Sequence, residues 1–124
     1  MFRNAKIFSS FSVNDVGKAK EFYGKTLGIP AKEDMGLELQ LAGGIHVFLY
    51  PKPDHQPATF TVLNFLVEDI DQAVDEMIGK GITFEQYSGQ LQTDEKGICR
   101  DGSPVIAWFK DPAGNILSVI EEGS

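Results

Sequence analysis

A short motif that occurs twice constrains the fold of this chain more than any other feature. Phe11–Val16 reads Phe-Ser-Val-Asn-Asp-Val, and Phe65–Ile70 reads Phe-Leu-Val-Glu-Asp-Ile at an offset of 54 residues. An alanine follows each copy at the same distance, at Ala19 and Ala73. A fixed offset is typical of a repeated structural unit. We therefore expect two related halves.

Each copy of the motif lies where a strand is expected to lead into a helix. Residues 7–13 and 60–67 are rich in β-branched and aromatic side chains, which favour strands. Asp15 and Asp69 follow these runs, and a carboxylate there can accept hydrogen bonds from the free amides of a first helical turn. Apolar residues then recur at helical spacing. Both halves are thus predicted to begin with a strand and an aspartate-capped helix.

Glycines and further strand-like runs complete each half. Gly28 and Gly81 are suited to left-handed helix ends. The segment Asp111–Asn115 contains a proline and a glycine in an order that favours a tight turn. The further strands are expected over 31–35, 37–41 and 45–50 in the first half, and over 82–87, 105–110 and 115–122 in the second. The predicted organisation is βαβββ, repeated once.

Two segments lie outside this pattern. Residues 51–58 contain three prolines and are interpreted as a linker within a single domain, residues 1–124. The linker separates a first module, residues 1–50, from a second module, residues 59–124. Residues 88–104 are mostly polar and include glycines. A loop of this length is usually functional or mobile. We expect it to form a lid or an exposed excursion.

Composition excludes several classes of protein. The chain has 42% hydrophobic residues and a mean hydropathy of −0.13, which suits a globular domain without a membrane span. Its formal net charge of −7 disfavours nucleic-acid binding. Cys99 is the only cysteine, so no intrachain disulfide can form. We expect a cytoplasmic protein without a signal peptide that binds neither nucleic acid nor membranes.

Five segments together carry a resemblance to a known family. They are Val13-Asn14-Asp15, Phe22-Tyr23, Leu27-Gly28-Ile29, Val67-Glu68-Asp69-Ile70 and the run from Ala107 to Ile116. In order and spacing they resemble the vicinal oxygen chelate superfamily, which includes glyoxalase I, extradiol dioxygenases, fosfomycin resistance enzymes and bleomycin resistance proteins. The resemblance implies an α+β fold in which two βαβββ modules form cup-shaped mixed sheets with helices on the convex face. It also implies a homodimer whose cups are completed across the interface.

Strand alternation indicates which side chains would line such a cup. Ile7, Ser9, Phe11 and Val13 share one face of the first strand, which is expected to lie under the helix. The opposite faces of the strands mix aromatic, hydroxyl and amide groups, as ligand cavities do. The candidate ligand-binding residues are Phe8, Ser10, His46, Phe48, Tyr50, Val62, Asn64, Trp108 and Ser118.

The resemblance also locates where metal ligands would lie. Metal-dependent members place His or Gln on the first strand of each module and Glu on the last. Counted from the two motif aspartates, these positions are Phe8, Phe48, Val62 and Ser118 in this chain. None of them offers the expected imidazole or carboxylate. We therefore predict no metal and no cofactor.

Three other residues carry chemistry that the pattern does not assign. His46 is either a base or hydrogen-bonding group of the cup, or a strand histidine satisfied by a neighbour. His55, in the linker, is expected to be solvated. Cys99 lies between Lys96 and Arg100, whose charge can favour a thiolate, but no partner group is recognisable beside it. We interpret the thiol as a spectator.

Three functions are compatible with these residues. The first is a metal-independent small-molecule-binding protein of the bleomycin-resistance type, with a planar or cationic ligand in an aromatic-lined cup. The second is a glyoxalase-type lyase or isomerase acting on a small oxygenated metabolite. The third is an interaction module whose cup is filled by its own side chains. The sequence pattern assigns no catalytic residue.

Overall fold

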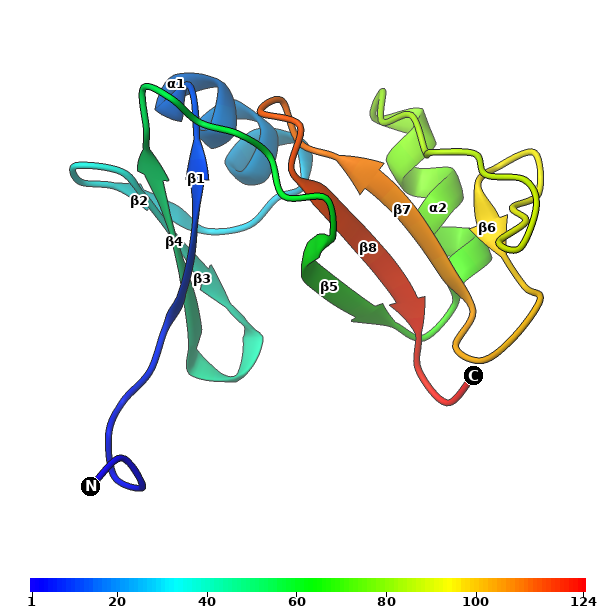
Figure 1. Ribbon diagram of the computed structural model, residues 1–124, viewed down its shortest axis with the longest axis horizontal. Coiled ribbons are helices and arrows are strands. Elements are labelled where there is room, and N and C mark those ends of the chain that lie inside the picture. Colours follow the sequence, from blue (N-terminus) through cyan, green and yellow to red (C-terminus); the bar gives the residue numbers. More distant parts are fainter. The chain divides into compact units, whose positions relative to one another are not determined.

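Each half of the chain folds into a four-stranded mixed sheet whose first strand is followed by a helix (Figure 1). The computed structural model describes all residues, 1–124. The chain divides into two compact units, unit 1 over Met1–Pro57 and unit 2 over Ala58–Ser124. The two sheets have the same strand order, so the repeat read from the sequence corresponds to a repeat of topology.

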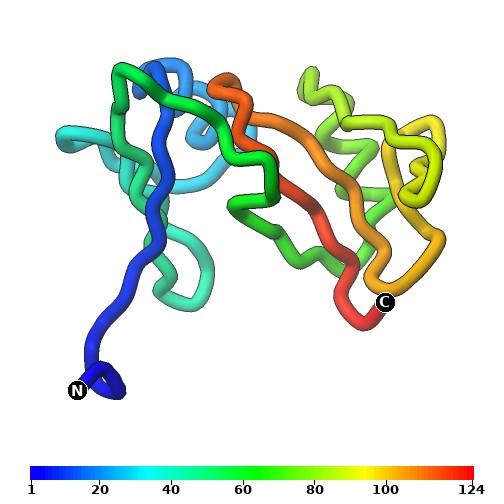
Figure 2. Tube along the Cα trace, viewed as in Figure 1, coloured from blue at the N-terminus to red at the C-terminus, as the bar shows by residue number.

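Unit 1 has the order β1-β4-β3-β2, with β1 parallel to β4 and the other neighbours antiparallel. Residues 1–8 precede β1. Figure 2 shows the N-terminal end of the chain, at the blue end of the tube, running away from the strands of unit 1. The strands are β1 (Ser9–Val13), β2 (Ala31–Glu33), β3 (Leu37–Leu41) and β4 (Ile45–Pro51). The helices are α1 (Val16–Ala19), continued by the π-helix η1 (Lys20–Thr26), and the short 3-10 helix η2 (Ala42–Gly44).

Unit 2 repeats this plan in the order β5-β8-β7-β6, with β5 parallel to β8. The antiparallel pairs are β8 with β7 and β7 with β6. Its elements are β5 (Thr61–Val67), α2 (Ile70–Gly79), β6 (Ile98–Cys99), β7 (Ile106–Lys110) and β8 (Ile116–Glu121). No helix of the chain has the length and apolar character that crossing a bilayer requires.

The two motif aspartates cap their helices, as predicted. Oδ1 of Asp15 accepts a hydrogen bond from the amide of Lys18 at 3.0 Å, and Oδ1 of Asp69 accepts one from Gln72 at 3.1 Å. The predicted helix ends are confirmed as well, since Gly28 and Gly81 have positive φ.

Each unit buries its own apolar face. Alternate strand residues enter the core with the inner face of the helix, as the pleat requires. In unit 1 the fully buried side chains include Val13, Tyr23, Leu37, Leu39 and Leu49, and in unit 2 they include Ile70, Val74, Ile98, Phe109 and Leu117. At about 1.5–3 kcal/mol for each large apolar side chain, this burial dominates the stability of both units.

The structure differs from the predicted elements in several places. The first helix changes to π-helical geometry at Lys20. At the end of the π-helix, the amide of Leu27 donates a hydrogen bond to the carbonyl of Phe22. The predicted strand over 82–87 contributes only an isolated bridge at Phe84. The segment 88–104 contains the short strand β6, because Ile98 and Cys99 pair with β7. The strand β4 also continues one residue into the predicted linker.

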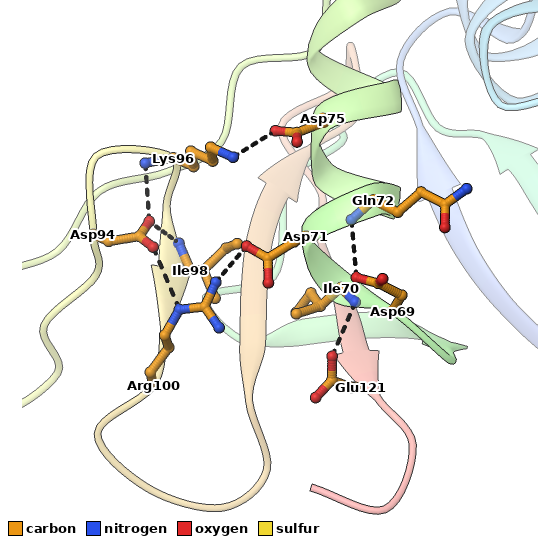
Figure 3. Close-up of polar contacts among 10 residues, drawn as sticks. All are labelled: Asp69, Ile70, Asp71, Gln72, Asp75, Asp94, Lys96, Ile98, Arg100 and Glu121. Atoms are coloured by element: carbon orange, nitrogen blue, oxygen red, sulfur yellow. Dashed lines mark hydrogen bonds and ion pairs between the residues drawn. The ribbon is translucent and has the colours of Figure 1, made fainter.

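Charged side chains attach the segment 88–104 to helix α2 (Figure 3). Nζ of Lys96 lies 2.8 Å from Oδ1 of Asp75, and Nη2 of Arg100 lies 2.5 Å from Oδ1 of Asp71. Asp94 organises the loop between these cations, because its Oδ1 accepts the amides of Lys96 and Ile98, each at 2.9 Å. The segment is therefore an excursion held against α2.

The pKa of Asp94 lies below its ordinary value of 3.8. Burial opposes ionisation, but the amide hydrogen bonds from Ile98 and Lys96 and the charge of Arg100 outweigh it. Ionisation of Asp94 thus stabilises this loop.

Candidate functional site

The face of the unit 1 sheet opposite its core carries most of the candidate residues of the first module. The register places Ser10 beside Phe48, and Phe48 beside Glu38 on the next strand. His46 pairs with Gln40 one step further along. These residues alternate with the buried core positions of the same strands, so they share the face opposite the core.

One end of this face is hollowed into an open pocket of 790 Å³. Three of the predicted residues, Phe8, His46 and Phe48, line it. The other lining residues are Lys6, Ile7, Glu38 and Gly44. The volume is within the range typical of small-molecule sites.

The placement of Ile7 corrects an expectation. Alternation put Ile7 on the helix-covered face, whereas its side chain is 90% exposed and lines the pocket. The reason is that β1 begins only at Ser9, so the residues before it are not held by a ladder and need not alternate. Lys6 enters the pocket in the same way, and no periodic pattern could have indicated it.

His46 and Glu38 form the polar part of the pocket. Nδ1 of His46 lies 3.3 Å from Oε1 of Glu38, and both side chains are about half exposed, at 48% and 42%. Nε2 of Gln40 donates to the same Glu38 oxygen at 3.4 Å. Nε2 of His46 and Nζ of Lys6 have no hydrogen-bonding or ionic partner in the chain. Both nitrogens are open to a bound molecule.

The position of the Phe48 ring depends on a glycine. A Cβ at Gly36 would lie 2.6 Å from Cζ of Phe48 and 2.6 Å from the carbonyl oxygen of Leu49. Gly36 itself is buried, so the missing side chain leaves the space that the Phe48 ring occupies. This close approach fixes one aromatic wall of the pocket.

The candidate residues of unit 2 form a second group on the matching face of their sheet. Asn64, Ser118 and Trp108 are neighbours across β5, β8 and β7. The hydroxyl of Ser118, which is fully buried, donates to Oδ1 of Asn64 in a short hydrogen bond. The indole of Trp108 meets Tyr87 edge-on with ring centroids 5.5 Å apart. Val62 lies at a bulge at the start of β5.

Two candidate residues lie outside the pocket of unit 1. Ser10 is exposed on β1, and Tyr50 is 37% exposed near the end of β4. Neither belongs to the lining. The assignment of Ser10, Tyr50 and the unit 2 residues to ligand binding stays a prediction.

The positions that hold the metal in metal-dependent relatives do not suit a divalent ion here. Phe8, Phe48 and Val62 have no donor atoms, and the hydroxyl of Ser118 is engaged with Asn64. No group of three or more His, Cys, Asp or Glu side chains with metal-binding geometry occurs in the chain. The donor set therefore lacks the nitrogen and carboxylate ligands that such an ion prefers.

His55 and Cys99 have structural surroundings. The sequence suggested a solvated His55, but the ring is partly buried and its Nδ1 lies 2.6 Å from Oγ of Ser12. This contact attaches the linker to β1. Cys99 is a buried free thiol in β6, and the neighbouring cations Lys96 and Arg100 pair with the carboxylates of Figure 3.

Charge is distributed unevenly between the two units. Unit 1 contains seven Lys and Arg against six Asp and Glu, whereas unit 2 contains four against twelve. The acidity of the chain therefore belongs to unit 2. Unit 1, which contains the pocket, has no acidic excess that would attract a cationic ligand.

Solved structures with the same fold cover almost the whole chain. A glyoxalase family protein from Enterococcus faecalis is 21% identical over 98% of this chain and 100% of its own, with a TM-score of 0.70. The antibiotic-binding protein TnmS3 from a Streptomyces species is 21% identical over 95% and 97%, with a TM-score of 0.65. The fosfomycin resistance protein FosX from Listeria monocytogenes is 11% identical over 95% and 93%, with a TM-score of 0.69. At these identities the likeness establishes the fold alone.

Sequence comparison establishes the family. No curated protein matches the sequence. Residues 8–119, however, match the family model of the Glyoxalase/Bleomycin resistance protein/Dioxygenase superfamily. This match spans both units and the motif repeats from which the resemblance was inferred. The chain therefore belongs to the glyoxalase/bleomycin resistance protein/dioxygenase superfamily.

Proposed function

We propose that this protein binds a small aromatic molecule without a metal, in the pocket of unit 1. The observation that carries the proposal is the pocket itself, which has 790 Å³ of space and the rings of Phe8 and Phe48 in its lining. Phenyl rings at the two first-module ligand positions of metal-dependent relatives supply stacking surface in place of metal donors. The fold shared with TnmS3, an antibiotic-binding protein, supports a binding role.

The experiment that tests this proposal measures ligand-induced stabilisation. A panel of planar aromatic compounds is added to the purified protein, and the melting temperature is followed with each. A compound at about one hundred times its Kd stabilises the fold by about 2.7 kcal/mol. We expect stabilisation by members of the panel in wild type and its loss in Phe48→Ala.

The matched control is Phe2→Ala, which removes an 80% exposed phenyl ring that does not line the pocket. This variant should keep the stabilisation. A panel without any effect on the wild-type protein, or equal loss in both variants, contradicts the proposal. Metal independence is tested by elemental analysis of protein purified without chelator, and a stoichiometric metal contradicts metal independence. Melts with Mg, Mn, Fe, Co, Ni or Zn added separately test the same point.

The second candidate is a glyoxalase-type lyase or isomerase. The unpartnered Nε2 of His46 favours it, because a free imidazole nitrogen in a pocket can accept a proton from a substrate. Assay of methylglyoxal hemithioacetal with each added divalent metal distinguishes the two functions. Turnover that His46→Gln abolishes would favour the enzyme.

We further propose that the protein is a cytoplasmic homodimer and binds no nucleic acid. The edge strand β5 supports the dimer, because Leu66 is 65% exposed on it and Phe60, just before it, is 67% exposed. The twelve acidic residues of unit 2 support the exclusion of nucleic acid.

A further inference from the structure

The pocket of unit 1 contains one histidine nitrogen, Nε2 of His46, whose lone pair is available to accept a proton. Oε1 of Glu38 lies 3.3 Å from Nδ1 of His46. A carboxylate in that place stabilises a proton on Nδ1, so the lone pair of the neutral ring resides on Nε2. Nε2 has no partner in the chain, and His46 lines the pocket.

The groups around His46 favour a ligand that becomes negatively charged when bound. Glu38 on β3 balances the charge of a protonated His46 ring. Lys6, from the segment before β1, lines the same pocket and has no anionic partner. Gln40 is neutral, and its Nε2 donates a hydrogen bond to Oε1 of Glu38. Once His46 is protonated, the pocket has one positive charge that no group of the chain balances.

We propose that His46 and Glu38 select aromatic ligands that carry an acidic hydroxyl group, such as phenols and aromatic enols. The inference rests on the proposed binding function and names its ligand class. The rings of Phe8 and Phe48 contact the aromatic part, and Nε2 of His46 takes the hydroxyl proton.

The proton transfer balances without any further reactant. The O–H bond of the ligand breaks and an N–H bond forms at Nε2, while the electron pair of the broken bond stays on the ligand oxygen. The products are an imidazolium beside the Glu38 carboxylate and a phenolate or enolate near the Lys6 ammonium. Charge-assisted hydrogen bonds of this kind are stronger than neutral ones.

A pair of probes tests this step directly. The first probe is 4-nitrophenol, whose ionised form absorbs visible light. The second is 4-nitroanisole, which has the same ring system but a methyl ether in place of the hydroxyl. Each probe is titrated with the protein in a buffer acidic enough to keep free 4-nitrophenol mostly protonated. We expect 4-nitrophenol to bind about tenfold more tightly, with a rise in the absorbance of its anion.

Variants locate the effect on the two side chains. His46→Gln should abolish the absorbance rise and reduce the affinity for 4-nitrophenol about tenfold, while the affinity for 4-nitroanisole stays within about twofold. Glu38→Gln should reduce the absorbance rise severalfold. The control His55→Gln removes the other histidine, which bonds Ser12 rather than lining the pocket, and should keep the wild-type response.

The outcomes separate this inference from the proposed function. Equal binding of both probes without an absorbance rise overturns the inference and leaves the binding function standing. A rise that persists in His46→Gln also overturns it. Absence of 4-nitrophenol binding overturns the inference, and absence of binding by both probes counts against the proposed function as well.

Discussion

The wall of the pocket formed by Phe48 depends on a single missing side chain. Gly36→Ala places a methyl group 2.6 Å from the Phe48 ring and from the Leu49 carbonyl, and the backbone atom cannot move away cheaply. We expect a loss of about 1–3 kcal/mol in the free energy of unfolding. Urea denaturation followed by circular dichroism measures it.

The control for this substitution is Gly79→Ala. Gly79 is the last residue of α2 and does not have a positive φ, and a Cβ added there would meet no atom within 4 Å. Alanine at this position should stabilise the protein by about 0.5–1 kcal/mol. Equal effects of the two substitutions would show that the close approach at Gly36 has no energetic consequence.

At the scale of residues, the sequence indicated part of the pocket. Alternation along the strand predicted His46 and Phe48, because β4 has a regular ladder on both sides. The contact between His46 and Glu38 joins residues on different strands and depends on the β3–β4 register, which a single sequence does not specify. Lys6 lies before the first ladder and follows no period.

At the scale of elements, the segment 88–104 is the part whose attachment responds to pH. Asp94 has a lower pKa in the folded chain than its ordinary value of 3.8, so its ionised form stabilises the loop. This contribution is complete above the unfolded pKa and is lost as the pH falls through the folded value. We expect amide hydrogen exchange of residues 94–100 to lose protection below about pH 4.

The variant Asp94→Asn provides the comparison. It should expose these amides already at neutral pH and remove the acid-dependent change, whereas Asp101→Asn, an exposed site in the same segment, should behave as wild type. The ion pairs to α2 add little, since exposed pairs contribute about 0–1 kcal/mol each. An unchanged acid response in Asp94→Asn would assign the effect to another carboxylate.

The elements themselves could largely be predicted, and the exceptions have physical reasons. Caps and strands follow from local chemistry, as Asp15 and Asp69 show. The π-helix has the same apolar spacing as an α-helix over so few residues, so periodicity does not distinguish them. The strand β6 is only two residues long and exists because β7 offers it a partner.

At the scale of the whole molecule, we expect light scattering to give the mass of a dimer. Leu66→Lys puts a charge on the exposed edge strand β5 and should shift the protein toward the monomer. Met35→Lys, at a 91% exposed turn, is the control and should leave the dimer intact. A monomeric wild-type protein would contradict the proposed assembly.

The shared strand order also separates the framework from the chemistry it carries. Ser10 and Phe48 face each other across the parallel pair of unit 1, and Asn64 and Ser118 do so at the equivalent place in unit 2. The ladder is the same, but one pair combines a hydroxyl with a phenyl ring and the other combines an amide with a hydroxyl. Each half therefore carries a different surface on the same hydrogen-bonded scaffold, so substitutions on this face of one sheet can change its binding specificity without altering the other half.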